Sequence, residues 1–389
     1  MAAPIAVPQP LRQGGEIHWR GKDVDAVTVA AQLLELRQHA ADDEGFPLAR
    51  ASVMNLLVYA SDRKQVDQAI KTVEALALRH PSRAIVVAAR PGKVFSLDAE
   101  VAIHRHPLAS HGLIYERAIL RAVGADPDGL DTLVIPLLIP HLQSFLWWLG
   151  RPDPLAPALR SLASICDRLI LDSSCGTPEQ LREVAEELAA AGLANSPLGR
   201  LVIGDMTWTR LDGLREALAR AFDEGRRAEY LTGLHRVDIV GYRGLTHPVS
   251  CGELLMAGWI ASRLGCTSPT WTPEGASLRV EGSGQRALFS FSGIKGHRAP
   301  TGLVRPPVES VRISTELRSR SLNVALKWGE GDGRLSVHET GHPVIRRTVP
   351  VPQPDEIEVV SRELARLGRD IIFEEALASA ARIQAALTS

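Results

Sequence analysis

The sequence predicts an α/β protein with a mixed, largely parallel α/β region, followed by an antiparallel β-sheet with C-terminal helices. Three observations predict this class. Short apolar runs alternate with amphipathic helical segments as far as about Leu264. After Cys266 the strand-like segments are closely spaced and several are joined by glycine-rich turns. From Pro354 to about Leu387 a helical pattern returns, with a break expected near Gly368.

The composition is that of a globular protein with no strong overall charge. The chain has 389 residues, of which 45% are hydrophobic and 23% are charged. This length allows two or three domains. Lys and Arg number 44 against 45 Asp and Glu, so no net electrostatic field favours a polyanion or an anionic membrane. We therefore expect neither nucleic acid nor a membrane as a partner.

The first residues read as a flexible tail, residues 1–20, because Pro4, Pro8 and Pro10 interrupt any helix there. A basic segment followed by an apolar core, as in a secretion signal, is not found at this end. The longest apolar run, 133–149, is broken by prolines and is too short to span a bilayer. These features predict a cytoplasmic protein.

Strand and helix signals alternate through the N-terminal region. A helix at 24–39 is followed by a strand, a helix and a strand, at 53–59, 62–79 and 83–89, which form a β-α-β unit with parallel strands. Strands at 94–104, 114–123 and 144–149 and a helix at 128–138 come next. Three prolines in 151–157 indicate a boundary. We therefore expect an N-terminal α/β domain over 21–157.

The C-terminal domain is expected over 158–389, with its α/β half extending to about residue 265. A strand at 168–171 precedes a helix whose start is marked by the cap Thr177, Pro178 and the capping-box residue Gln180. A strand at 236–240 and a helix at 250–264 end this half. The antiparallel strands are expected at 278–281, 286–291, 308–316, 322–327, 335–337 and 345–349.

The segment 201–222 combines a strand, a short link and an amphipathic helix. The apolar run 201–203 is closed by Gly204, and apolar residues then recur at helical spacing from Leu211 to Phe222. Thr209, with Asp212 three residues later, is the expected helix cap. The link 205–208 therefore lies at the carboxyl end of a strand, where ligands and partners often bind in α/β sheets.

Three stretches resemble one family. The run GDMTWTRL at 204–211 resembles the D-x-x-W-T-R-L signature of the OpcA family, the glucose-6-phosphate dehydrogenase assembly proteins. RHPSRAIVV at 79–87 resembles the same family, as does VIPLLIP at 134–140 followed by LWW at 146–148. The resemblance runs in the same order from about Ser52 to the C-terminus. It implies a noncatalytic protein, without cofactor or metal, that binds glucose-6-phosphate dehydrogenase and promotes its assembly or allosteric activation.

Aromatic and arginine side chains are the candidate partner-binding residues, because such residues most often anchor interfaces. Trp147 and Trp148 are adjacent on a predicted strand, so their rings point to opposite faces of the sheet. Asp205, Trp208 and Arg210 of the signature complete the set. The alternative is that both adjacent rings are buried within the chain and that Arg210 forms an internal ion pair with a residue such as Asp205.

The segment 293–305 contains the candidate anion-binding residues Lys295, His297, Arg298 and Arg305, which could hold a phosphate or an acidic partner surface. A solvated basic loop is the alternative, and we favour it because exposed charges are ordinary. These residues support the competing hypothesis for the function, an enzyme or sensor acting on a sugar phosphate. It would use the strand ends near Asp205.

Two further motifs have a plainer explanation. The letters H-E-x-x-H at 338–342 match a zinc-protease motif, which requires a helix, whereas this segment is expected to end a strand. Four cysteines, Cys166, Cys175, Cys251 and Cys266, lie far apart without a C-x-x-C pair, so neither a zinc site nor a disulfide framework is expected. Cys175 precedes a helix, where a thiolate is favoured; the alternative is a thiol without a role.

Overall fold

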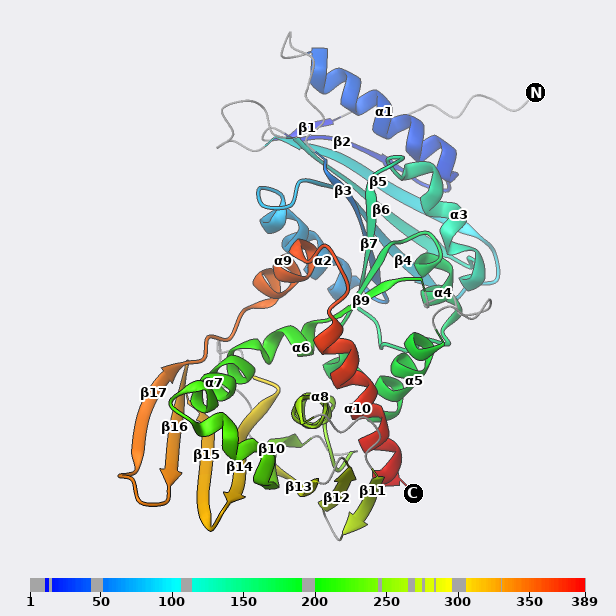
Figure 1. Cartoon of the computed structure of the whole chain (residues 1–389). Coiled ribbons are helices and arrows are strands. Elements are labelled where there is room, and N and C mark those ends of the chain that lie inside the picture. Colours follow the sequence, from blue (N-terminus) through cyan, green and yellow to red (C-terminus); the bar gives the residue numbers. More distant parts are fainter. Residues whose placement is uncertain are drawn as a thin grey trace, which may run out of the picture. The chain divides into compact units, whose positions relative to one another are not determined.

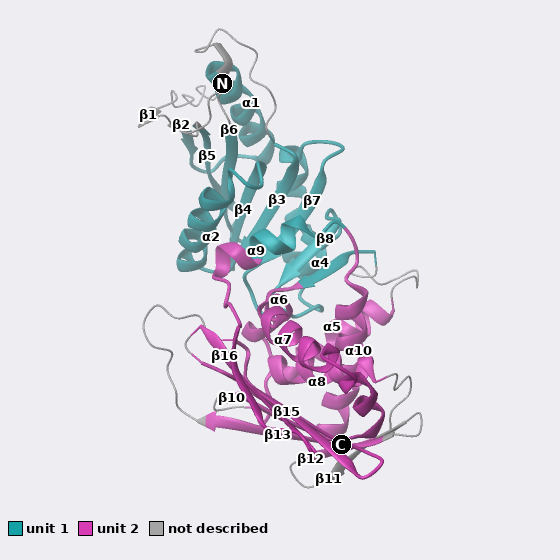
Figure 2. Cartoon of the chain, turned by 60° about the vertical axis from the view of Figure 1, so that its left-hand side comes forward, with its two compact units in different colours: residues 1–171, 192–204, 360–367 teal, residues 172–191, 205–359, 368–389 magenta. Residues whose placement is uncertain are grey.

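The structure is a computed structural model of the chain (Figure 1). It describes residues 11–13, 16–42, 52–105, 114–190, 200–243, 247–264, 270–274, 277–282, 285–295, 306–329 and 331–388. The chain forms two compact units (Figure 2). Unit 1 contains residues 1–171, 192–204 and 360–367, and unit 2 contains residues 172–191, 205–359 and 368–389. The proline-rich segment 151–157, predicted as a domain boundary, lies within unit 1.

A nine-stranded sheet forms the centre of unit 1, in the order β1-β2-β5-β6-β4-β3-β7-β8-β9. The predicted β-α-β unit is confirmed, because β3 and β4 pair in parallel. Strands β6, β7 and β8 continue the parallel part, whereas β5 is antiparallel to β6. The strands are β1 (Leu11–Gln13), β2 (Glu16–Gly21), β3 (Met54–Ala60), β4 (Ser82–Arg90), β5 (Ser96–Arg105), β6 (Ile114–Val123), β7 (Gln143–Trp148), β8 (Arg168–Leu171) and β9 (Val202–Asp205).

Strands β1 and β2 fall in the stretch for which the sequence predicted a loose tail. Strand β2 pairs with β5 over six residue pairs, and Trp19 is buried on it. The edge of β5 supplies hydrogen-bond partners that local sequence patterns do not show. Tertiary pairing therefore places β1 and β2 in the sheet, and residues 1–10 lie outside the described residues.

The helices of unit 1 follow the predicted periodicity. In α2 (Arg63–Leu76) the cap Asp62 accepts a hydrogen bond from the Gln65 amide at 2.9 Å, and Val66 and Val73 are buried. The helix expected at 128–138 is only five residues long, because prolines limit it to α3 (Leu130–Val134) between two 3₁₀ turns. The other helices are α1 (Ala26–Asp42), α4 (Pro157–Ala163) and α9 (Glu356–Ala365), which enters unit 1 at residue 360.

Unit 2 contains an eight-stranded sheet in the order β11-β12-β13-β10-β14-β15-β16-β17. Its pairs are antiparallel except β10 with β13, which are parallel. The strand that the sequence assigned to the α/β half, β10, belongs to this sheet, so that assignment was wrong. The strands are β10 (Leu234–Arg243), β11 (Thr270–Glu274), β12 (Ser277–Gly282), β13 (Gln285–Lys295), β14 (Val308–Leu317), β15 (Arg320–Trp328), β16 (Asp332–Glu339) and β17 (Ile345–Pro350).

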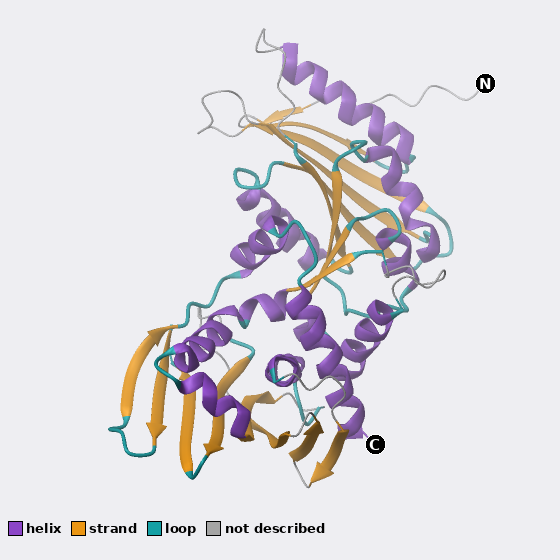
Figure 3. Ribbon diagram, in the orientation of Figure 1, coloured by secondary structure: helices purple, strands orange, loops and turns teal. Residues whose placement is uncertain are grey.

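Helices pack against one face of the unit 2 sheet (Figure 3). Helix α8 is buried along most of its length, and its Gly258 allows the backbone of α10 to approach closely near Ala376. The break predicted near Gly368 is confirmed, since α9 ends at Ala365 and α10 begins at Ile371. The helices of this unit are α5 (Pro178–Ala189), α6 (Met206–Arg210), α7 (Asp212–Asp223), α8 (Cys251–Arg263) and α10 (Ile371–Thr388).

The predicted start of α5 is confirmed. Thr177 caps this helix, and the side chain of Gln180 completes the capping box. The glycine predicted to stop the helix, Gly192, lies outside the described residues. Within the part of the chain that the structure describes, no helix combines the length and apolar character needed to cross a membrane.

Candidate functional site

The signature begins with a helix cap, but the cap is Asp205 and not Thr209. The Asp205 carboxylate accepts hydrogen bonds from the backbone amides of Thr207 at 2.7 Å and Ser173 at 3.4 Å. Helix α6 therefore starts at Met206, and Thr209 is buried within it. The prediction failed because Asp205, at the end of β9, is an equally good acceptor for the free amides of a first turn. The expected link 205–208 is part of this turn.

Asp172 is the acceptor that holds α6 in place. It accepts hydrogen bonds from the Ser174 hydroxyl at 2.6 Å, the Thr207 hydroxyl at 2.8 Å and the Arg210 guanidinium at 2.7 Å. The predicted internal ion pair of Arg210 therefore exists, but its partner is Asp172 and not Asp205. Burial raises the pKa of Asp172, yet Arg210 and the hydroxyl donors outweigh it and hold the pKa below its usual value. Asp172 is thus a paired carboxylate.

Asp205 differs from Asp172 in charge state. Its second carboxylate oxygen is buried and has no hydrogen-bond partner among the described residues. Burial and the nearby charge of Asp172 raise the pKa of Asp205 to about 7, although the hydrogen bonds from Ser173 and Thr207 lower it. Near neutral pH this carboxyl therefore takes up a proton readily. At pH 7 Asp205 is therefore about half ionised, and together with Asp172 it carries between one and two negative charges.

Trp208 is an internal anchor of α6. The side chain is 0% exposed, and its Nε1 donates to the Asp370 carboxylate at 3.0 Å. The Phe373 ring lies 5.7 Å away between centroids, and the Arg215 guanidinium lies 3.3 Å above the indole ring. In this structure Trp208 therefore offers no surface to a partner.

Trp147 and Trp148 lie on β7 in unit 1, so the structure does not group them with the signature residues of unit 2. They are 0% and 4% exposed. Trp148 stacks on Tyr59 with ring centroids 3.9 Å apart and donates its Nε1 to the Arg151 carbonyl at 2.8 Å. The alternative raised from the sequence, that both rings are buried in the chain, describes their position here.

Of the candidate anion-binding residues, Lys295 is the last residue of β13. His297, Arg298 and Arg305 lie outside the described residues, as does Cys266. Cys175 is an exposed residue after β8, but partial burial of its thiol and the Asp172 carboxylate raise its pKa. This direction does not favour the thiolate that its place near a helix start suggested.

The segment His338–His342 is the end of β16 and a turn, so the strand expected there is confirmed. The two histidines are therefore not one helical turn apart, as the zinc-protease motif requires. Over the described ranges no three His, Cys, Asp or Glu side chains are grouped as metal ligands. The side chain of Glu339 instead accepts a hydrogen bond from the Tyr230 hydroxyl at 3.3 Å.

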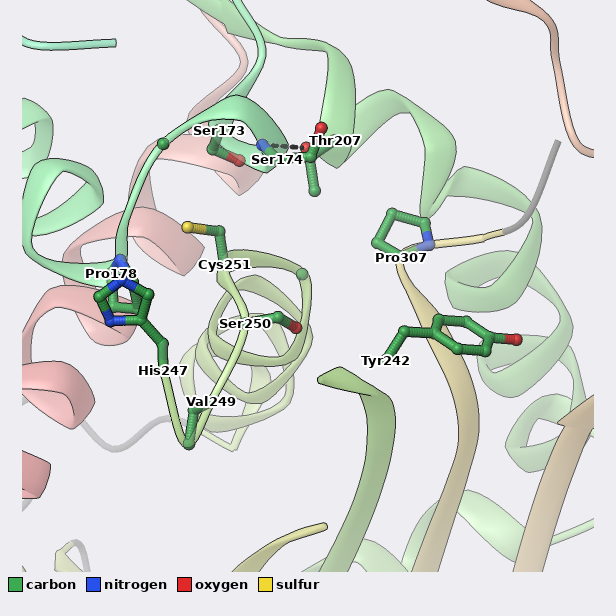
Figure 4. Close-up of a pocket in the computed structure, with 12 residues that line it drawn as sticks. Ser173, Ser174, Pro178, Thr207, Tyr242, His247, Val249, Ser250, Cys251 and Pro307 are labelled. Atoms are coloured by element: carbon green, nitrogen blue, oxygen red, sulfur yellow. Dashed lines mark hydrogen bonds between the residues drawn. The ribbon is translucent and has the colours of Figure 1, made fainter. Parts of the chain in front are cut away.

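A pocket of about 330 Å³ lies beside the signature, at the start of α8 (Figure 4). Its hydroxyl groups mostly donate to carboxylates: Ser174 and Thr207 to Asp172, and Ser250 to Glu253. Cys251 is buried at its floor, where burial and the nearby carboxylates raise the thiol pKa. These groups are neutral or already bonded, so the arrangement fits a structural role better than nucleophilic chemistry. The sequence predicted the helix at 250–264 but did not indicate this pocket, although the Ser250–Glu253 capping box can be read from it.

A second feature of unit 2 is a cationic surface that sequence patterns did not reveal. Arg312, Lys327, Arg334 and Arg346 are exposed on neighbouring strands β14 to β17, and we call them the basic strand face. The cross-strand pairs place Ser336 beside Arg346 and Lys327 beside Arg334 on one face of the sheet. All four line an open hollow of about 480 Å³.

Most of the positive charge on the basic strand face is not used in ion pairs with described residues. The Lys327 amine lies 3.9 Å from Glu309. Among the described residues, Arg312, Arg334 and Arg346 form no ion pair. The opposite face of these strands is covered, since α7 packs on β15 to β17 and Val311, Val324 and Val337 are buried. Strands β14 to β17 thus have buried apolar residues on one side and the basic strand face on the other.

Comparisons with known proteins all point to one family. The family model of the glucose-6-phosphate dehydrogenase subunit N-terminal domain matches residues 73–189, and the family model of the C-terminal domain matches residues 202–377. A putative OxPP cycle protein OpcA of Nostoc punctiforme is 26% identical over 330 residues, covering 80% of this chain and 67% of the relative. Proteins of the same name from Synechococcus elongatus and Synechocystis are 28% and 25% identical, each over 68% of this chain.

The chain spans between about half and two thirds of the length of these relatives, with 67%, 58% and 54% of each covered. The signature lies at the start of the second matched domain, and LWW at 146–148 lies within the first. The two domain models together cover most of the chain, in the order found in the family. The chain belongs to the OpcA family of glucose-6-phosphate dehydrogenase subunits.

Proposed function

We propose that this protein is a noncatalytic partner of glucose-6-phosphate dehydrogenase that binds the enzyme and promotes its assembly or allosteric activation. The observation that carries the proposal is the match of both subunit domains in order, over 73–189 and 202–377. The signature residues have an internal role: Arg210 pairs with Asp172 and Trp208 is buried, so they serve the fold of unit 2.

Activation of this kind needs a difference in affinity. A partner shifts an equilibrium between two enzyme states only if it binds one of them more tightly. Linkage makes the effect reciprocal. The factor by which this protein shifts the enzyme towards its active assembly equals the factor by which the active assembly binds this protein more tightly than the inactive one does. The contact surface must therefore meet a feature that the active and inactive enzyme present differently.

The basic strand face is the surface that best fits an acidic surface of the dehydrogenase. Arginine is enriched at the anchoring positions of interfaces, and complementary charge directs partners into register. Arg312, Arg334 and Arg346 are exposed and form no ion pair with a described residue. The tryptophans proposed from the sequence are buried, so the exposed arginines are the better candidates for the anchors.

The test mixes the purified protein with the dehydrogenase from the same source. We expect higher dehydrogenase activity at limiting glucose 6-phosphate, and light scattering should show a species larger than either protein alone. The absence of co-elution at micromolar concentrations would contradict the proposal. A complex that forms without any change in dehydrogenase activity would support binding and contradict activation.

A further inference from the structure

Three arginines from three different elements line a pocket in unit 1. Arg63 is at the start of α2, Arg90 ends β4, and Arg121 lies near the end of β6. The pocket has a volume of about 470 Å³, which is in the range that small ligands occupy. All three side chains are exposed, and within the described ranges none of them forms an ion pair. Their positive charge is therefore available to a ligand.

The pocket lies where α/β sheets bind ligands. Strands β4 and β6 are parallel, and Arg90 and Arg121 are close to their carboxyl ends. Ala88 pairs with Arg121, and Arg121 pairs with Asp98 of β5, so these side chains share one face of the sheet. Asp98 and Ser96 line the pocket together with the arginines.

The start of α2 adds positive charge to this end of the pocket. A helix N-terminus carries partial positive charge, which favours an anion beside it. In α2 that anion is the cap Asp62, whose carboxylate accepts a hydrogen bond from the Gln65 amide. The first turn itself has no acidic residue and begins with Arg63 and Lys64. Of these, Arg63 lines the pocket and adds its charge to that of Arg90 and Arg121.

We propose that this pocket binds a small phosphorylated sugar. The planar guanidinium groups of Arg63, Arg90 and Arg121 match the geometry of phosphate oxygens. Asp67 and Asp98 also line the pocket, and carboxylates accept hydrogen bonds from sugar hydroxyls. Three arginines against two aspartates leave one net positive charge, which attracts a phosphate anion.

This site goes beyond the proposed partnership, because it is built from unit 1 alone and needs no dehydrogenase. A binding measurement on the protein by itself can therefore fail or succeed independently of complex formation. If binding of the ligand and binding of the dehydrogenase are coupled, the ligand changes the affinity of this protein for the dehydrogenase. The dehydrogenase then changes the affinity of this protein for the ligand by the same factor.

The experiment measures binding to the full chain by calorimetry and by thermal unfolding, with glucose 6-phosphate, inorganic phosphate and glucose as probes. We expect glucose 6-phosphate to bind and to raise the unfolding temperature, because it binds the folded state. Inorganic phosphate should bind more weakly, since it lacks the sugar hydroxyls. Glucose should give no detectable binding.

Single variants test the arginines. R90A and R121A should each weaken glucose 6-phosphate binding by about tenfold or more, the effect of losing one charge-assisted hydrogen bond. R121K, which keeps the charge but loses the planar fork, should fall between wild type and R121A. The matched control is R160A, an exposed arginine of α4 in the same unit that does not line the pocket. It should bind as wild type does.

Several outcomes would overturn the proposal. The first is that neither phosphate compound binds wild type, and the second is that R160A loses as much affinity as R121A. If inorganic phosphate binds as tightly as glucose 6-phosphate, the sugar does not contribute and the ligand class is wrong. The unfolding temperature of each variant without ligand shows whether it is folded, so a loss of binding in a folded R121A protein supports the site.

Discussion

Gly204 lies directly against the carboxylate of Glu363, far apart in the sequence but within the same unit. A Cβ atom at position 204 would overlap that carboxylate. Glu363 is 0% exposed and pairs with the Arg168 guanidinium at 2.9 Å and with Arg366 at 2.8 Å. The glycine before the signature therefore makes room for a buried ion pair. This explains why the next-to-last residue of β9 has no side chain.

Replacing Gly204 by alanine should destabilise the protein. The added methyl group must displace Glu363 or the backbone of β9, and overpacking of this kind costs about 1–3 kcal/mol. Chemical denaturation should show the loss as a lower transition midpoint. The control is G129A, at a position where an added Cβ meets only Asp126 at 3.8 Å, and it should change the free energy of unfolding by less than about 0.5 kcal/mol. Equal stability of the two variants would contradict the contact.

Removing one partner of the buried pair should cost more than removing both. In E363L the Arg168 charge stays buried without its carboxylate, and such losses are about 3–5 kcal/mol. The double variant E363L with R168M should be more stable than E363L alone, because no uncompensated charge is left. Urea unfolding of wild type, both single variants and the double variant measures this. A double variant that is less stable than either single one would contradict the argument.

The raised pKa of Asp205 predicts a pH-dependent loss of stability. Its pKa is about 7 in the folded protein against an ordinary value of 3.8 for an aspartate. Between these values the unfolded chain releases the proton first, so the free energy of unfolding falls as pH rises from about 4 to about 7. D205N keeps a capping side chain and cannot ionise. Its stability relative to wild type should therefore increase over this window, by an amount of the order of a few kcal/mol.

The measurement for Asp205 is the unfolding free energy of wild type and D205N at several pH values from 4 to 8, taken in the same buffers. D62N is the control, because Asp62 is also a helix cap but is exposed at the start of α2. A constant difference between wild type and D205N across the whole range would show that Asp205 does not titrate there.

Charge reversal on the basic strand face should weaken the complex with the dehydrogenase. The double variant R312E with R334E places negative charge where we expect an acidic partner surface, so affinity should fall by about tenfold or more and the association rate should decrease. The wild-type complex should weaken with rising salt. The control is R320E, an exposed arginine at the other end of β15 that does not line the hollow. If R320E weakens binding as much, the effect is not specific to this face.

Part of the site could be predicted and part could not. The strand before the signature, the helix after it and the internal ion pair of Arg210 were all expected. The partner of Arg210 could not be, because Asp172 is distant in the sequence from the signature. The starting point of α6 was missed since two residues, Asp205 and Thr209, are both suitable caps. The arginines of the two pockets lie on different strands and, for Arg63, on helix α2, so only strand pairing and helix packing bring them together.

The sequence by itself determined the local elements and the family. The Thr177–Gln180 capping box, the parallel β3-α2-β4 unit and the break before α10 follow from neighbouring residues, because caps and periodicity act over a few positions. Only the tertiary structure decided that β10 joins the sheet of unit 2, that Gly204 faces Glu363 and that the basic strand face is continuous. These features depend on strand register and on close approach between distant segments, which local propensity does not specify.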